Sequence, residues 1–117
     1  MSTEKYRIPF DVTDWSVVSA TTHPGETGLA IWKTLQLGGL RIRMVEYSTN
    51  YLADHWCQKG HLLFVLEGKL ITELSDGKKF EMTKGMSYQV SDELSSHQSF
   101  SPDGAKLLIV DGSFLAV

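Results

Sequence analysis

The chain has 117 residues, of which 42% are hydrophobic and 21% charged, and this balance is typical of a globular protein with one domain. The formal net charge is −3 and the Lys and Arg residues form no cluster, so neither nucleic acid nor an anionic membrane is indicated as a partner. No apolar run approaches the roughly 20 residues of a membrane span. The N-terminal residues lack the features of a signal peptide, so we expect a cytoplasmic protein.

The N-terminal part of the chain gives weak structural signals. Residues 8–10 and 15–18 fit either edge strands or loops that cover the core. Residues 29–35 fit a helix or a strand by pattern alone, and the glycine before them with the sheet expected after them favours a strand. We therefore assign residues 1–39 to strands or a covering segment at the start of a single domain that spans residues 1–117.

From residue 40 onward, short predicted strands alternate with clear turn signals. The expected strands cover residues 40–47, 62–66, 69–74, 79–82, 87–90, 98–100 and 106–110. Asp76-Gly77 is the strongest short hairpin signal, and Asn50, which ends the turn after the first of these strands, tolerates a left-handed backbone. Many short strands with frequent turns are typical of an all-β sandwich or barrel.

The run Leu62–Leu66 is apolar at every position, which predicts a strand that is buried on both faces. Only one face of this strand can point into a small barrel. The other face must then be covered by the N-terminal segment, with Phe10, Trp15 and Trp32 as candidates, or by a second chain. We expect a homodimer.

Four side chains suit a metal site: His55, Cys57, His61 and His97. In a regular strand His55 and Cys57 would point the same way. His61 opens an apolar strand, where a buried polar side chain needs a partner, and His97 comes from a later, serine-rich segment. Nitrogen and sulfur donors suit one divalent transition-metal ion (zinc, iron or nickel) rather than magnesium or calcium. Cys57 has no second cysteine to pair with, and can be a ligand, a buried apolar side chain or a reactive thiol.

The spacing of these residues resembles the first motif of the cupin family. His55-x-Cys57-x-x-x-His61, followed by six residues and Gly68, has the spacing of that motif. Cys57 stands in the place of its second histidine, and His61 stands in the place of its glutamate. The usual cupin ligand set includes this carboxylate, and because the motif of this chain lacks it, an enzyme would need its acid/base group from elsewhere.

The second cupin motif is matched less well. Gly85 and His97 resemble its two ends, but His97 lies one residue late. Ser91, Glu93 and Ser101 stand where the motif has Pro, Gly and Asn.

A narrower resemblance concerns the small bacterial cupins that are named for their DHCW residues. Residues 51–61 read YLADHWCQKGH, and residues 85–90 read GMSYQV. The resemblance covers about residues 40–111. It implies an all-β double-stranded β-helix, the jelly-roll or RmlC-like barrel, with one metal ion bound by the four residues above. It implies no defined reaction.

Two functions of different class fit this reading, and a third depends on Cys57 alone. The first is a metal-dependent enzyme, an oxygenase, isomerase or lyase, that acts on a small molecule inside the barrel. The second is a non-catalytic module that binds a small molecule or senses a metal. The third is redox sensing through Cys57. Four protein ligands would fill the coordination shell of the metal, as in structural sites. Three protein ligands would leave one coordination position open for a substrate or water, as in catalytic sites.

The residues that would assist catalysis remain open. Tyr88 and Glu46 are the candidate acid/base groups, although strand alternation allows only one of Tyr88 and Gln89 to point inward. Arg41 and Arg43 share one strand face. They either belong to a solvated or interface surface or bind a carboxylate substrate through their forked donors.

Overall fold

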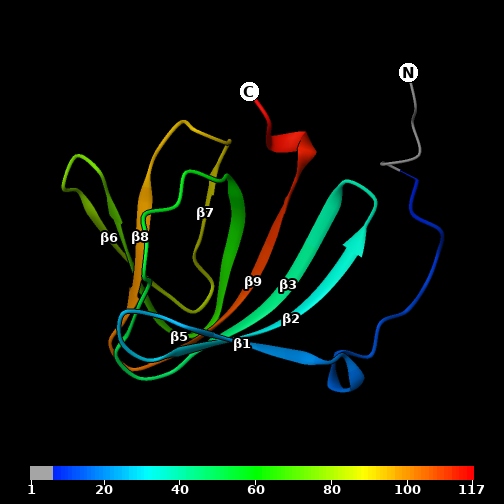
Figure 1. The fold of residues 1–117 in the computed structure, drawn as a ribbon, viewed down its shortest axis with the longest axis horizontal. Coiled ribbons are helices and arrows are strands. Elements are labelled where there is room, and N and C mark those ends of the chain that lie inside the picture. Colours follow the sequence, from blue (N-terminus) through cyan, green and yellow to red (C-terminus); the bar gives the residue numbers. More distant parts are fainter. Residues whose placement is uncertain (1–6) are drawn as a thin grey trace.

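The computed structural model describes residues 7–117, which form nine β-strands and two short 3₁₀ helices (Figure 1). The strands are β1 (Ala20–Pro24), β2 (Leu29–Leu37), β3 (Leu40–Tyr47), β4 (Tyr51–Leu52), β5 (His61–Leu74), β6 (Lys79–Thr83), β7 (Ser87–Val90), β8 (His97–Ser101) and β9 (Ala105–Gly112). The helices are η2 (Trp15–Val17) and η3 (Ser113–Leu115). Within the described part of the chain, no helix has the length and apolar character needed to cross a membrane. The all-β prediction is confirmed.

All strands belong to one antiparallel sheet that curls into a half-barrel (Figure 1). Its order is β1-β2-β3-β9-β5-β8-β4, and β6 and β7 pair with β5 outside this path. The first half of β5 pairs with β9 and β7, and its second half pairs with β6 and β8. β5 therefore belongs to two facing layers of the half-barrel.

The bend in β5 occurs at a glycine. The register of β5 against β9 shifts between Val65 and Glu67, and Gly68 follows with a φ of 82°. Glycine adopts this left-handed conformation at little cost. A Cβ at position 68 would also clash with the carbonyl oxygen of Gly104. This position therefore requires glycine for both reasons.

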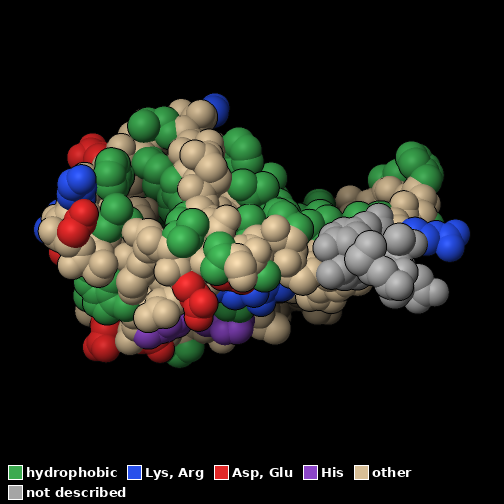
Figure 2. Space-filling view, turned by 90° about the horizontal axis from the view of Figure 1, so that it is seen from above, with side chains coloured by type: hydrophobic (Ala, Val, Ile, Leu, Met, Phe, Trp, Pro, Cys, Tyr) green, Lys and Arg blue, Asp and Glu red, His purple; other side chains and the backbone are tan. Residues whose placement is uncertain are grey.

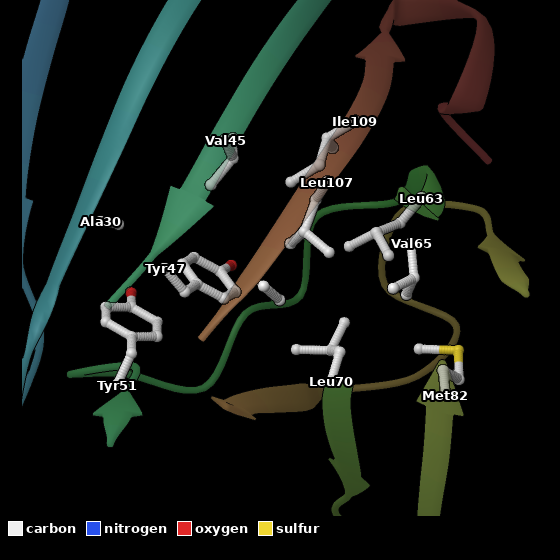
Figure 3. Packing of buried hydrophobic residues seen from close by; sticks show 11 residues of the cluster. Ala30, Val45, Tyr47, Tyr51, Leu63, Val65, Leu70, Met82, Leu107 and Ile109 are labelled. Carbon is white, nitrogen blue, oxygen red and sulfur yellow. The ribbon is translucent and has the colours of Figure 1, made fainter. Parts of the chain in front are cut away.

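The hydrophobic core fills the space between the two layers (Figure 3). Leu63 and Leu107 from the first layer face Leu70 and Met82 from the second. Each side chain comes from the inward-pointing set of its strand, because alternate residues of a strand point to opposite faces. The interior also holds buried polar side chains, among them His61, His97 and Asp111.

Local signals predicted most turns and strands correctly. Residues 29–37 form the strand that the pattern favoured, and Asn50 adopts a φ of 58°. The Asp76-Gly77 turn joins β5 to β6, with the Gly77 N–H donating to the Leu74 carbonyl at 2.9 Å.

The outer face of β5 is not buried within one chain, so of the two covers expected for it the N-terminal segment does not bury Phe64 and Leu66. Phe64 is 45% exposed and Leu66 is also exposed, because the described N-terminal segment does not cover them. Residues 7–14 lie away from β5 (Figure 1), and Phe10 is 94% exposed. Residues 8–10 form no strand, and η2 lies within residues 15–18. In Figure 2, hydrophobic side chains gather along the upper edge of the main body of the molecule.

Candidate metal centre

Three of the four predicted metal-binding side chains converge inside the half-barrel. Cys57 lies in the loop before β5, and His61 and His97 are the first residues of β5 and β8. Cys57 and His97 form an isolated antiparallel bridge, with backbone N–H···O distances of 2.8 and 3.0 Å. One donor atom from each of the three side chains lies within 4.8 Å of the others. The loop and the two strand ends thus define one site.

The hydrogen bonds of the two imidazoles direct the same ring nitrogen towards this site. His61 Nδ1 lies 3.1 Å from Asp111 Oδ2, and His61 Nε2 lies 3.6 Å from Cys57 Sγ. His97 Nδ1 donates to the carbonyl oxygen of Ser95 at 3.0 Å. A carbonyl oxygen only accepts, so a neutral His97 has its proton on Nδ1 and a free lone pair on Nε2.

A buried carboxylate holds His61 in place. Asp111 in β9 is 1% exposed and accepts from Nε and Nη2 of Arg41, both at 2.8 Å, and from Nη2 of Arg43 at 3.0 Å. Arg43 is buried as well, and its guanidinium carbon lies 4.5 Å from the ring centroid of Trp32. Two cations therefore compensate the charge of Asp111, while its Oδ2 also contacts His61.

The charges of the site follow from these contacts. A hydrogen bond with His61 and then the nearby imidazole of His97 lower the pKa of the Cys57 thiol to about 5, against the opposing effect of burial. Burial alone would raise the pKa of Asp111, but hydrogen bonds from His61 and Arg41 and the charge of Arg43 hold it well below its usual range. Burial opposes protonation of His61, yet its hydrogen bonds to Asp111 and Cys57 raise its pKa. Cys57 is thus a thiolate at neutral pH.

The residues present fit a transition-metal ion. Nε2 of His97 is buried and has no hydrogen-bond partner among residues 7–117. A buried polar atom without a partner is costly, and a metal ion bound by this nitrogen would remove that cost. Two imidazole nitrogens and one thiolate form a donor set that suits zinc, iron or nickel and not magnesium or calcium.

His55 does not join this group in the structure. Residues 53–60 form a bent loop rather than a strand, so the alternation that would place His55 beside Cys57 does not apply. The His55 side chain is 71% exposed, and its Nδ1 lies 2.6 Å from Asp54 Oδ1. His55 nevertheless lines the same cavity, at its outer part.

The two candidate acid/base residues lie on different faces of the sheet. Tyr88 points inward from β7. Its neighbour Gln89 is exposed, so Tyr88 is the one of these two residues that can face the cavity. The Tyr88 ring meets the His97 ring edge to face, with 5.7 Å between centroids. Glu46 is exposed between the buried residues Val45 and Tyr47 of β3, and therefore points away from the cavity.

A cavity of about 220 Å³ adjoins the three converging side chains. Arg41, Arg43 and Lys59 contribute to its lining, together with the aromatic rings of Trp32, Tyr47 and Tyr88. No Asp or Glu side chain lines it among the described residues. Arg41 and Arg43 lie on one strand face as expected, whereas Asp111, their shared partner, was not among the expected site residues. Alternate residues of β9 from Ala105 to Asp111 are buried, so Asp111 lies on the inner face, but the continuous apolar run before it gives no sign of this alternation in the sequence.

Comparison with known proteins gives matches at the level of the fold. No family model matches the chain, and none of the curated proteins matches it. An RmlC-like cupin from Shewanella frigidimarina NCIMB 400 is 17% identical, with 89% of this chain and 91% of that chain covered, at a TM-score of 0.71. A predicted oxalate decarboxylase from Thermotoga maritima is 12% identical, with 86% and 96% covered, at 0.73.

A third similar structure is ectoine synthase from P. lautus, which is 14% identical, with 86% of this chain and 76% of that chain covered, at a TM-score of 0.70. Such low identities carry the fold and not the reaction. The chain is an all-β protein whose curled antiparallel half-barrel has the cupin fold.

Proposed function

We propose that this protein binds one divalent transition-metal ion through Cys57, His61 and His97 and acts as a metal-dependent enzyme on a small anionic molecule. The observation that carries the proposal is the convergence of two Nε2 atoms on the Cys57 sulfur, one of them buried without a partner. Both imidazoles are already oriented by hydrogen bonds through Nδ1. Such bonds fix the tautomer that a metal ligand needs.

Three protein ligands leave a coordination position for a small molecule. Sites of this kind are usually catalytic, whereas structural sites bind the metal with four protein ligands. A metal ion at this position would supply Lewis-acid chemistry by polarising an oxygen of the ligand. The cupin fold and this ligand set support an oxygenase, isomerase or lyase as the class of enzyme without choosing among them.

The charge of the cavity supports an anionic ligand. Arg41, Arg43 and Lys59 line it, and Asp111 compensates only part of this positive charge. Guanidinium groups bind carboxylates and phosphates well because their donors form a planar fork. Burial raises the pKa of the Tyr88 hydroxyl, so Tyr88 stays protonated at neutral pH and can donate a hydrogen bond to the ligand.

Replacing His97 by alanine should abolish stoichiometric metal binding, because it removes one of three ligands. Replacing His55 by alanine should leave the stoichiometry at one ion per chain, since His55 is exposed and pairs with Asp54. Elemental analysis of both variants, after loading with zinc under reducing conditions and desalting, tests this. Loss of the metal from His55→Ala would instead support a closed shell of four ligands and a structural metal. Failure of the wild-type protein to bind zinc, iron or nickel would refute the proposal.

We also propose that the open outer face of the sheet packs against a second copy of the chain. Phe64 in β5 lies opposite Leu108 in β9, and Leu108 lies opposite Met44 in β3, so a continuous apolar strip crosses three strands. Apolar surface of this kind is favourably buried in an isologous dimer.

Light scattering should therefore give twice the chain mass of 13.1 kDa for the wild-type protein. Phe64→Glu should give the monomer mass, because two introduced carboxylates would face a buried interface. Leu94→Glu changes another exposed apolar residue, outside the sheet, and should stay dimeric. A wild-type monomer at micromolar concentration would contradict the proposal.

A further inference from the structure

A second chamber lies behind the metal centre, in the gap between the two layers of the half-barrel. β6 and β7 pair with opposite halves of β5, so they diverge from each other and leave this gap open. The chamber has a volume of about 280 Å³. Tyr88 and His97 line both this chamber and the metal cavity, so their rings form a shared wall.

The two spaces differ in chemistry. The chamber walls include the rings of Phe80, Tyr88 and His97 and the apolar side chains of Leu74, Met82 and Val90. Among residues 7–117, no Asp, Glu, Lys or Arg side chain lines the chamber, whereas Arg41, Arg43 and Lys59 line the metal cavity. Transfer of an ion into such surroundings is costly. The chamber thus favours an uncharged occupant, and the rings and the Met82 thioether favour an aromatic one.

Besides Nε2 of His97, which belongs to the metal centre, the chamber wall has a second polar group without a hydrogen-bond partner. Thr72 is 4% exposed, and its Oγ1 makes no hydrogen bond within the described residues. Rotation about χ1 moves a threonine hydroxyl among three staggered positions, and Thr72 lines the chamber, so its hydroxyl can turn towards an occupant. An occupant with a hydroxyl or carbonyl group would therefore gain a hydrogen bond that the protein alone does not make.

From the volume, the uncharged lining and this free hydroxyl, we infer that the chamber is a binding site for a small neutral aromatic molecule that carries one hydrogen-bonding group. Small-molecule sites combine apolar walls with a few polar groups that fix orientation, and the chamber has this composition. The site does not depend on the metal ligands being occupied. It is a second site beyond the proposed metal function, and either could fail without the other.

The probe for this site is 4-fluorophenol, observed by fluorine NMR with the full-length protein, first without added metal and again after loading with zinc. We expect saturable binding in both forms. Thr72→Val keeps the side-chain shape and removes the hydroxyl, so affinity for 4-fluorophenol should fall about fivefold, the effect of one net hydrogen bond. Fluorobenzene, which lacks the hydroxyl, should bind Thr72→Val and the wild type equally. The anion 4-fluorobenzoate should not displace 4-fluorophenol.

A pocket-filling variant locates the binding. Val90→Phe should abolish binding of 4-fluorophenol, because the added ring occupies the chamber, whereas Val12→Phe adds the same ring at an exposed position and should have no effect. Binding that is absent in the wild type, or that persists in a folded Val90→Phe variant, would overturn the inference. If Val90→Phe does not fold, the affinities of 4-fluorophenol and fluorobenzene for Thr72→Val decide. The inference would also be overturned if both probes lost affinity equally, or if neither lost affinity.

Discussion

Replacing Asp111 by asparagine should weaken metal binding about 10–100-fold, the usual effect of losing a residue that orients a metal-bound histidine. Asp111 is buried and contacts His61, Arg41 and Arg43 at distances of 2.8–3.1 Å. Asparagine has nearly the same shape but cannot compensate two guanidinium groups. Arg43 would remain buried without an opposite charge and close to Arg41. We therefore also expect the free energy of unfolding to fall by about 3–5 kcal/mol.

The stability loss has a defined pH dependence. The pKa of Asp111 is lowered in the folded protein, so its charge stabilises the fold above the unfolded pKa of about 4 and loses this effect as the pH falls through the folded value. The difference between wild type and Asp111→Asn should thus be complete at neutral pH and shrink progressively as the pH falls below about 4 towards the folded pKa. Urea unfolding at several pH values measures it. Asp103→Asn, at an exposed turn, is the control, and a variant at position 111 with wild-type stability and affinity would contradict the role of this network.

Cys57→Ser should have the other large effect. The Cys57 thiol is deprotonated at neutral pH, since its pKa is about 5, and it is the only sulfur donor of the site. A serine hydroxyl at this position stays protonated and is a poor ligand for a soft metal ion. We expect cobalt-substituted wild-type protein to show a sulfur-to-metal charge-transfer band that Cys57→Ser lacks. Affinity for zinc should fall by more than about 100-fold, because residues that merely orient a ligand already contribute up to that amount.

Ser95→Ala is the matched control for this experiment. Position 95 lies next to the site, but His97 Nδ1 donates to its backbone carbonyl, which alanine retains. The control should keep both the band and the affinity. Cobalt-loaded wild-type protein without the band, or a Cys57→Ser variant with wild-type affinity, would show that the thiolate is no ligand. The proposed ligand set would then be wrong.

The sequence predicted those parts of the fold that depend on local signals. Turns with glycine or asparagine at left-handed positions, such as Asn50 and Gly77, follow from steric preferences of single residues. β1 was missed because Ala20–Pro24 is short and exposed at four of five positions, so its only signal is its pairing with β2. β5 was expected as two runs interrupted at Gly68, because a glycine bend inside one strand resembles a turn in the sequence.

In the candidate site, likewise, contacts between residues close in the sequence were predicted, and contacts between distant residues were missed. Cys57 and His61 are four residues apart, and motif spacing brought them together. Asp111 is 70 residues from Arg41, and only the register of β9 against β3 makes them neighbours. His55 was expected in the site from the motif spacing and from strand alternation, and it lines only the outer part of the cavity because residues 53–60 form a bent loop.

The position of β9 in the sheet has a consequence for synthesis on the ribosome. β9 lies between β3 and β5, yet it is translated after all the other strands. Until it emerges, β3 and β5 each carry an unpaired edge, and Arg43 and His61 lack the carboxylate that β9 supplies. Exposed strand edges of a nascent chain are prone to aggregate. The nascent chain must therefore remain incompletely folded until β9 has left the exit tunnel, and premature termination before residue 105 would leave a fragment with two open edges and without Asp111, which orients His61.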